Sequence, residues 1–206
     1  MSTINLTKGS QPAVLTKSQN IRLRCWWDSR TDYDLYALVL YADGRVETVA
    51  TFPADGVPKQ EATADGAVKH LGDVGRQHVG VAEEVITISL TDEIRAIVAV
   101  AYSAQSNGTG SFFEYRVSME LENGLDERVV VDAKNASRNS RIYTCVPGMI
   151  ENTPEGLFVH ALEHYSAPGS EYRPLVTLGR RGMLGLKKDD NAVSIAMDKG
   201  PRNKYK

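Results

Sequence analysis

The segment WWDSRTDYDLYALVLYADGRV, residues 26–46, places a group of aspartates directly before a long apolar run. Asp28, Asp32 and Asp34 fall within seven residues, and the run Leu35–Tyr41 that follows is aliphatic and aromatic, which favours a strand. Asp43-Gly44 then closes the segment with a common hairpin turn. Neighbouring carboxylates repel one another, so a fold that holds them together usually neutralises them with a cation or with basic side chains. The segment therefore predicts carboxylates gathered at a strand end, with a solvated acidic loop as the alternative.

Alternating or β-branched runs on both sides of this segment predict further strands. Turn signals separate these runs, and Asn123-Gly124 joins two of them in a predicted hairpin. The predicted strands are residues 3–7, 20–27, 35–41, 45–51, 85–90, 94–102, 112–121, 127–131, 141–146, 174–178 and 192–197. So many short strands without a βαβ rhythm indicate an all-β protein, and we expect a β-sandwich of two antiparallel sheets.

One short helix is predicted in the C-terminal part of the chain. Thr153-Pro154-Glu155 has the residue types of a helix start, with threonine as N-cap and proline at the first helical position. Apolar side chains then recur at helical spacing before Pro168-Gly169, at Leu157, Phe158, Ala161, Leu162 and Tyr165.

Length and composition are those of an ordinary globular chain. It has 206 residues, of which 42% are hydrophobic and 24% are charged, and its formal net charge is −2. We expect one domain over residues 1–180 and a basic tail over 181–206, because eight basic and three acidic residues follow position 179. The net charge gives no reason to expect a nucleic-acid partner. There is no signal-like N-terminus and no long apolar span, so we expect a cytoplasmic protein in which Cys25 and Cys145 are buried thiols.

Carboxylates recur at two other junctions between a loop and a strand. Asp73 lies in the glycine-rich and proline-rich stretch from Phe52 to Gly80, and Glu83-Glu84 precedes the strand predicted from Val85. Loops of a sandwich gather at its two ends, so carboxylates from separate strands can meet there. Flexible loops with oxygen ligands suit Ca²⁺, which takes six to eight oxygens. We therefore expect a Ca²⁺ site and a functional role for the 52–80 loop.

The order of these motifs resembles the TerD-type tellurium-resistance and general stress proteins. The resemblance covers roughly residues 4–131 and consists of an N-terminal Asn-Leu-Thr-Lys-Gly, a Trp-Asp-x-Arg segment, Asp-Tyr-Asp-Leu, Val-Lys-His-x-Gly-Asp and an acidic pair before a strand. Members of that family are β-sandwich proteins that bind calcium through acidic loops. They are associated with bacterial tellurite resistance and stress responses, without an established enzymatic reaction. The resemblance implies metal ligands at Asp28, Asp32, Asp34, Asp73, Glu83 and Glu84.

Three positions depart from the family pattern. Tyr36 and Ala82 stand where the family usually has aspartate, and Val74 stands where it has asparagine. Each change removes an oxygen ligand, and the number of charged ligands tunes calcium affinity. The resemblance therefore implies fewer ions, weaker binding or none. It also fades from Arg141 onward.

Two other classes of function compete with this interpretation. His160-Ala161-Leu162-Glu163-His164 matches the H-x-x-E-H spacing of a zinc hydrolase, in which two histidines on one helix face bind zinc and the glutamate acts as base. A calcium-dependent lipid-binding sandwich would instead use Arg180, Arg181, Lys187 and Lys188. The leading hypothesis has no catalytic residues and an unidentified protein partner or a second copy of the chain as its binding partner.

Overall fold

Two six-stranded sheets form the framework of the fold. The computed structural model describes residues 2–28, 31–75, 78, 80–107, 111–132, 137–179 and 191–204. The first sheet has the strand order β1 (Ser2–Leu6), β10 (Glu127–Val131), β9 (Ser118–Glu122), β3 (Ile21–Asp28), β7 (Val81–Ile88) and β6 (Val68–His70). The second has the order β2 (Ala13–Leu15), β12 (Gly156–Tyr165), β11 (Thr144–Thr153), β8 (Ile94–Tyr102), β4 (Asp34–Tyr41) and β5 (Val46–Val49). Among the strand pairs that the structure describes, β1 and β10 run parallel and the others run antiparallel.

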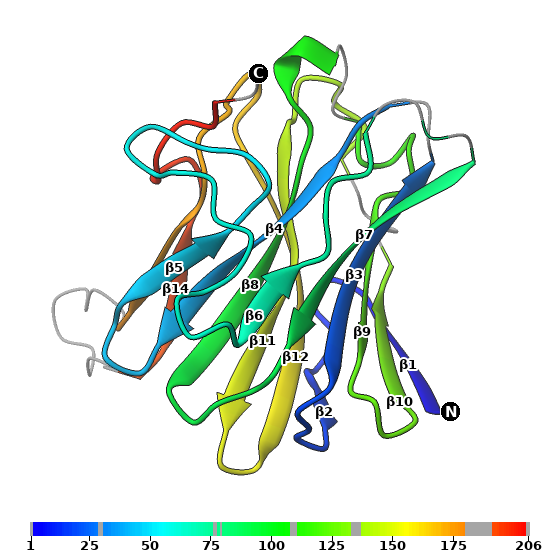
Figure 1. The fold of residues 1–206 in the computed structure, drawn as a ribbon. Helices are drawn as coiled ribbons and strands as arrows, with labels where there is room; N and C mark the ends of the chain where they lie inside the picture. The colour runs from blue at the N-terminus through cyan, green and yellow to red at the C-terminus, as the bar shows by residue number, and fades with distance from the viewer. Residues whose placement is uncertain are drawn as a thin grey trace, which may run out of the picture.

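The two sheets face each other across one main core (Figure 1). Alternate residues of β3, such as Leu23 and Trp27, meet alternate residues of β4, such as Leu35 and Val39. Trp27 is fully buried and packs against Tyr33 with a ring-centroid distance of 5.9 Å. The predicted all-β fold and the β4 and β5 hairpin are therefore confirmed.

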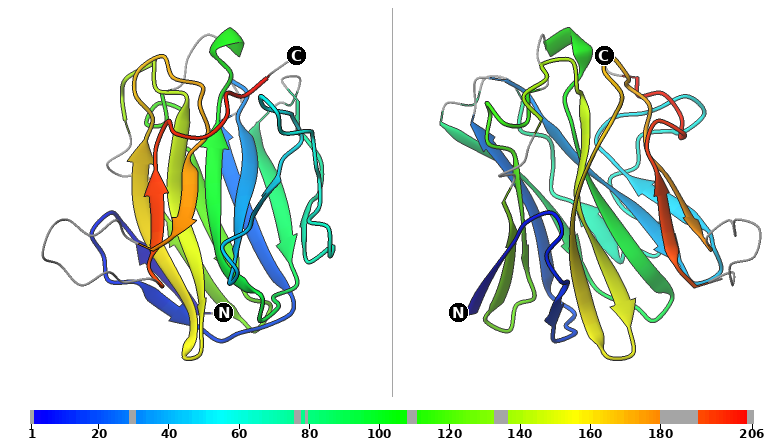
Figure 2. Two further views of the ribbon diagram at one scale, coloured as in Figure 1. Left: turned by 90° about the vertical axis from the view of Figure 1, so that its left-hand side faces the viewer. Right: turned by 180° about the vertical axis from the view of Figure 1, so that it is seen from behind.

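The outward faces of the two sheets differ in chemistry. On the first sheet, charged side chains form a ladder across the four strands β7, β3, β9 and β10, in which Arg24 bridges Glu83 and Glu120 and Arg128 also reaches Glu120. On the second sheet, residues such as Leu38 and Val98 belong to a second apolar cluster, which the ribbon of β13 (Leu175–Leu178) and β14 (Val193–Ala196) covers (Figure 2). Burial on both faces explains why β4 and β8 are nearly continuous apolar runs.

The helix predicted after Thr153 is wrong, because this segment is strand β12. Thr153-Pro154-Glu155-Gly156 is the turn of the β11 and β12 hairpin, with proline at the second position and glycine at the fourth, as tight turns favour. Leu157, Val159 and Ala161 face the main core, whereas Leu162 packs against the second cluster. Apolar residues on both faces of the strand reproduced a helical spacing. Among the described residues the single helical element is a 3₁₀ turn at Gln105–Asn107.

The part of the basic tail that the structure describes is packed against the body of the protein. β14 pairs with β13, Asn203 accepts a hydrogen bond from buried Arg173, and Lys204 N donates to Pro53 O at 2.9 Å. Residues 180–190, which include the four basic residues of the lipid-binding alternative, lie outside the described residues. No helix in the described chain is long and apolar enough to cross a membrane.

A bulge in β11 depends on a glycine that has no room for a side chain. A Cβ at Gly148 would lie 2.6 Å from Met119 Cε and 2.7 Å from the backbone oxygen of His160. We predict that Gly148→Ala lowers the free energy of unfolding by about 1–3 kcal/mol, since the backbone oxygen cannot rotate away. Urea denaturation measures this change. Gly75→Ala, where a Cβ meets nothing within 4 Å, is the control, and equal losses in the two variants would contradict the bulge geometry.

Candidate metal site

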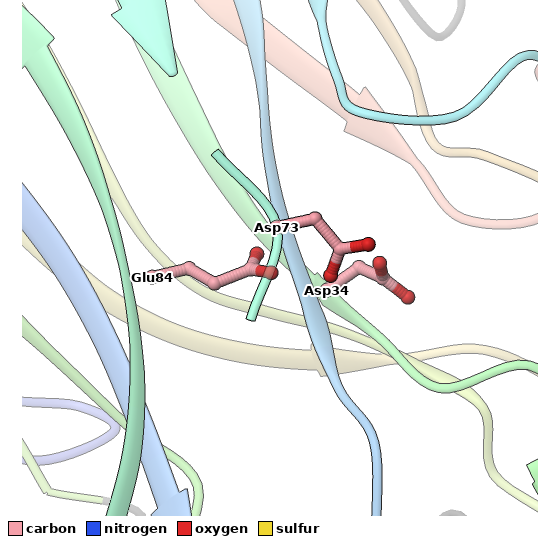
Figure 3. A group of neighbouring side chains, drawn as sticks. All are labelled: Asp34, Asp73 and Glu84. Carbon is pink, nitrogen blue, oxygen red and sulfur yellow. The ribbon is translucent and has the colours of Figure 1, made fainter. Parts of the chain in front are cut away.

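Three carboxylates from three separate segments meet beside the border between the two sheets. Asp34 begins β4, Asp73 lies in the loop after β6, and Glu84 lies within β7. One oxygen from each lies within 4.8 Å of the other two, and Figure 3 shows the Glu84 carboxylate directed toward the other pair. Asp34 and Glu84 are 1% exposed, whereas Asp73 is exposed. We call Asp34, Asp73 and Glu84 the carboxylate triad.

Glu84 is held in place by backbone amides from both sides of the border. Leu35 N donates to Oε2 at 2.6 Å, and Val74 N donates to Oε1 at 3.1 Å. Leu35 follows Asp34 in β4, and Val74 follows Asp73 in the loop. These two hydrogen bonds therefore set the distances between the three members of the triad.

His70 at the end of β6 completes the environment of Glu84. Gly72 N donates to His70 Nδ1 at 3.1 Å, so the proton of a neutral ring is on Nε2. Nε2 lies 2.8 Å from Leu35 O and 3.3 Å from Glu84 Oε2. Gly72 has a φ of +117°, which favours glycine and bends the loop so that Asp73 reaches the triad. The His-x-Gly-Asp motif therefore has two roles, an anchor at His70 and a ligand at Asp73.

Burial shifts the proton equilibrium of Glu84. Loss of solvent raises the pKa of its carboxyl, and the hydrogen bonds from His70, Leu35 and Val74 act in the opposite direction without cancelling the effect. The two neighbouring carboxylates of the triad add negative charge at the same place. A bound cation would favour the ionised form of all three.

The other three residues implicated from the sequence lie outside the triad. Glu83 is adjacent to Glu84 and points to the opposite face of β7, where its carboxylate lies 3.1 Å from Arg24. Asp28 ends β3, and Asp32 is buried in the segment between β3 and β4. His70 is not among the six residues predicted from the sequence, although it belongs to the same His-x-Gly-Asp motif as Asp73.

The donor set of the triad fits a hard divalent cation. Ca²⁺ binds carboxylate oxygens at about 2.3–2.6 Å, so two ligands on opposite sides of the ion are separated by about 5 Å. Oxygens that lie within 4.8 Å of one another can therefore share one ion. Tyr36, which stands at one of the departures from the family pattern, adds no ligand, since its side chain belongs to the second apolar cluster. Three carboxylates supply at most six of the six to eight oxygens that Ca²⁺ takes.

The zinc-hydrolase alternative required a helix at His160–His164, and this motif lies in strand β12 instead. His160 and His164 line a pocket on the outer side of β12, where His160 Nε2 lies 2.7 Å from Glu151 Oε2. Glu163 is 1% exposed and contacts different partners, since its carboxylate accepts hydrogen bonds from Lys8 N and Tyr165 Oη at 3.3 Å each. The proposed base is therefore not beside the two proposed zinc ligands.

Loss of the Glu84 carboxylate should destabilise the protein even without metal. Glu84→Ala removes the acceptor for two backbone amides, so we predict a decrease in the free energy of unfolding of about 2–3 kcal/mol in urea denaturation. Glu83→Ala is the matched control, because it removes only a partly exposed ion pair and should change this free energy by less than about 1 kcal/mol. Similar losses for the two variants would mean that Glu84 does not anchor the site.

Comparison with known proteins gives matches in structure but not in sequence. No protein-family model matches the chain, and no curated protein matches its sequence. Among solved structures, SAV2460, described as a protein of unknown function, matches with a TM-score of 0.55 and 16% identity over 73% of this chain and 91% of that one. SCO6318 from Streptomyces coelicolor A3(2), described as a homologue of the telluride resistance protein TerD, matches with a TM-score of 0.49 and 14% identity over 72% and 90%. The chain therefore shares its overall fold with SAV2460.

Proposed function

We propose that this protein is a divergent, non-enzymatic protein of the TerD-like stress-response type that binds Ca²⁺ through Asp34, Asp73 and Glu84. The observation that carries the proposal is the meeting of these three side chains within 4.8 Å. They come from three motifs, Asp-x-Asp-Leu, His-x-Gly-Asp and the acidic pair, whose order in the sequence suggested the family. A cytoplasmic location and a protein partner stay predictions.

Calcium at this place would act by linking segments. The triad joins β4, β7 and the 71–75 loop, so an ion shared by all three resists their separation. It also offsets the repulsion among the carboxylates and the cost of burying Glu84 in its charged form. Binding would thereby order the surface of the 71–75 loop, which we propose as the surface that a protein partner recognises.

Asp73→Asn tests the calcium site directly. Asp73 is exposed, so the variant should fold normally while calcium affinity in calorimetric titration falls by about tenfold or more, because a charged ligand is lost. Glu83→Gln should leave the affinity unchanged. If the wild-type protein gives no heat and no rise in Tm at millimolar Ca²⁺, the calcium proposal is wrong, since a ligand selective for the folded state must stabilise it.

Calcium binding should weaken as the pH falls. Because burial raises the pKa of Glu84, its carboxyl takes up a proton at a higher pH than an exposed glutamate and must release it to bind the ion. Without calcium, the same shift gives stability that is present at low pH and is lost as the pH rises through the folded-state pKa. We therefore predict a smaller calcium-induced rise in Tm at about pH 5 than at about pH 7.5, because Glu84 holds a proton more often at the lower pH. A rise that is equal or larger at about pH 5 would contradict this assignment.

A further inference from the structure

A pocket of about 460 Å³ adjoins the carboxylate triad, and its lining contains both acidic and basic side chains. Its volume is in the range of small-molecule sites in proteins. Two members of the triad contribute to it, and two ammonium groups and an apolar surface complete most of the lining; these residues are Asp34, Asp73, Lys59, Lys204, Phe52 and Pro53. Positive and negative groups thus line the same hollow.

An ion held by the triad would have coordination positions facing this pocket. Glu84 lies on the β7 side of the triad and is not part of the pocket lining, whereas Asp34 and Asp73 are. Ca²⁺ takes six to eight oxygens and accepts ligands from water or from a bound molecule. A ligand oxygen in the pocket can therefore complete the coordination shell.

The two lysines hold only weak partners on the protein surface. Lys59 Nζ lies 2.8 Å from Glu61, and Lys204 Nζ lies 2.8 Å from Asp55, with all four side chains about half exposed or more. Exposed pairs of this kind contribute about 0–1 kcal/mol, so either ammonium can turn toward a ligand at little cost. The backbone hydrogen bond from Lys204 N to Pro53 O keeps the second lysine at the pocket.

Arg173 places a buried positive charge next to Phe52, one of the residues that line the pocket. Arg173 is 1% exposed, donates to Phe52 O at 3.0 Å, and has its guanidinium carbon 5.2 Å from the centre of the Phe52 ring. No carboxylate forms an ion pair with Arg173 within the part of the chain that the structure describes, and its Nη1 has no hydrogen-bond partner there. A buried cation without an anion is costly, so negative charge on the other side of Phe52 would be favourable.

We propose that this pocket binds a small ligand through an oxyanion, a carboxylate or a phosphate, that contacts both the calcium ion and the ammonium groups of Lys59 and Lys204. The proposal rests on the proposed calcium site and specifies the class of ligand that it takes. Phe52 and Pro53 offer an apolar surface for the remainder of the ligand. Calcium and the anion would then bind cooperatively, each raising the affinity of the other by the same factor.

The test uses two probes that differ only in the anionic group, phenyl phosphate and benzoate, with benzyl alcohol as the neutral control. Each is titrated calorimetrically into the full-length protein with and without Ca²⁺. We expect one or both anions to bind about tenfold or more tightly with calcium, and calcium to gain the same factor when the anion is present. The anion that shows this coupling identifies the carboxylate or the phosphate as the source.

The double variant Lys59→Gln and Lys204→Gln separates the pocket from the metal site. It should bind calcium alone as the wild-type protein does and lose about tenfold or more of its anion affinity, whereas Lys17→Gln, at an exposed lysine outside the pocket lining, should lose neither. Three results overturn the oxyanion proposal while leaving the calcium site intact. The wild-type protein binds calcium but neither anion, or its anion affinity does not depend on calcium, or the double variant keeps the full anion affinity. Failure to bind calcium overturns the calcium site, and any anion binding that persists then shows a pocket that works without metal.

Discussion

The buried carboxylate of Glu84 is the interaction on which the candidate site depends. Its two oxygens accept hydrogen bonds from Leu35 N in β4 and Val74 N in the loop after β6, and His70 lies against it. A buried carboxylate is tolerated only when it is hydrogen-bonded or paired. The requirement to satisfy Glu84 thereby fixes the start of β4 and the 71–75 loop at one place, and Asp34 and Asp73 follow because each precedes one of the two donors.

The C-terminal segment that covers the outer face of the second sheet also contributes charged residues near the candidate site. The ribbon of β13 and β14 and the segment up to Lys204 bury apolar side chains of β4 and β8. The same segment brings Arg173 under Phe52 and Lys204 to the rim of the pocket. The C-terminal region, in which the family resemblance fades, therefore supplies much of the positive charge near the acidic motifs of the N-terminal half.

The sequence predicted strands well where one face is exposed to solvent or where a run is continuously apolar. The alternation of Ile21, Leu23 and Cys25 with arginines and a tryptophan, and the continuous run of Ile94–Tyr102, each led to a strand that the structure contains. It failed at β12, since two apolar layers cover opposite faces of that strand and mask the period of two. β2 and β6, with three residues each, are too short for any periodicity to reveal.

For the candidate site, the sequence by itself determined which types of side chain are available, and the tertiary structure decided which of them lie together. The residue types and the order of six acidic residues predicted an oxygen-ligand site at strand ends, because carboxylates gathered in this way favour a cation; these are Asp28, Asp32, Asp34, Asp73, Glu83 and Glu84. The sequence placed Glu83 and Glu84 before a strand that starts at Val85, whereas β7 already starts at Val81. The two side chains therefore face opposite sides of a strand, and Glu83 points to Arg24. Only the fold could bring Lys59 and Lys204, which are far apart in sequence, to one pocket beside the triad. Contacts of this kind depend on how the C-terminal segment packs across the second sheet, and no local pattern in the sequence encodes them.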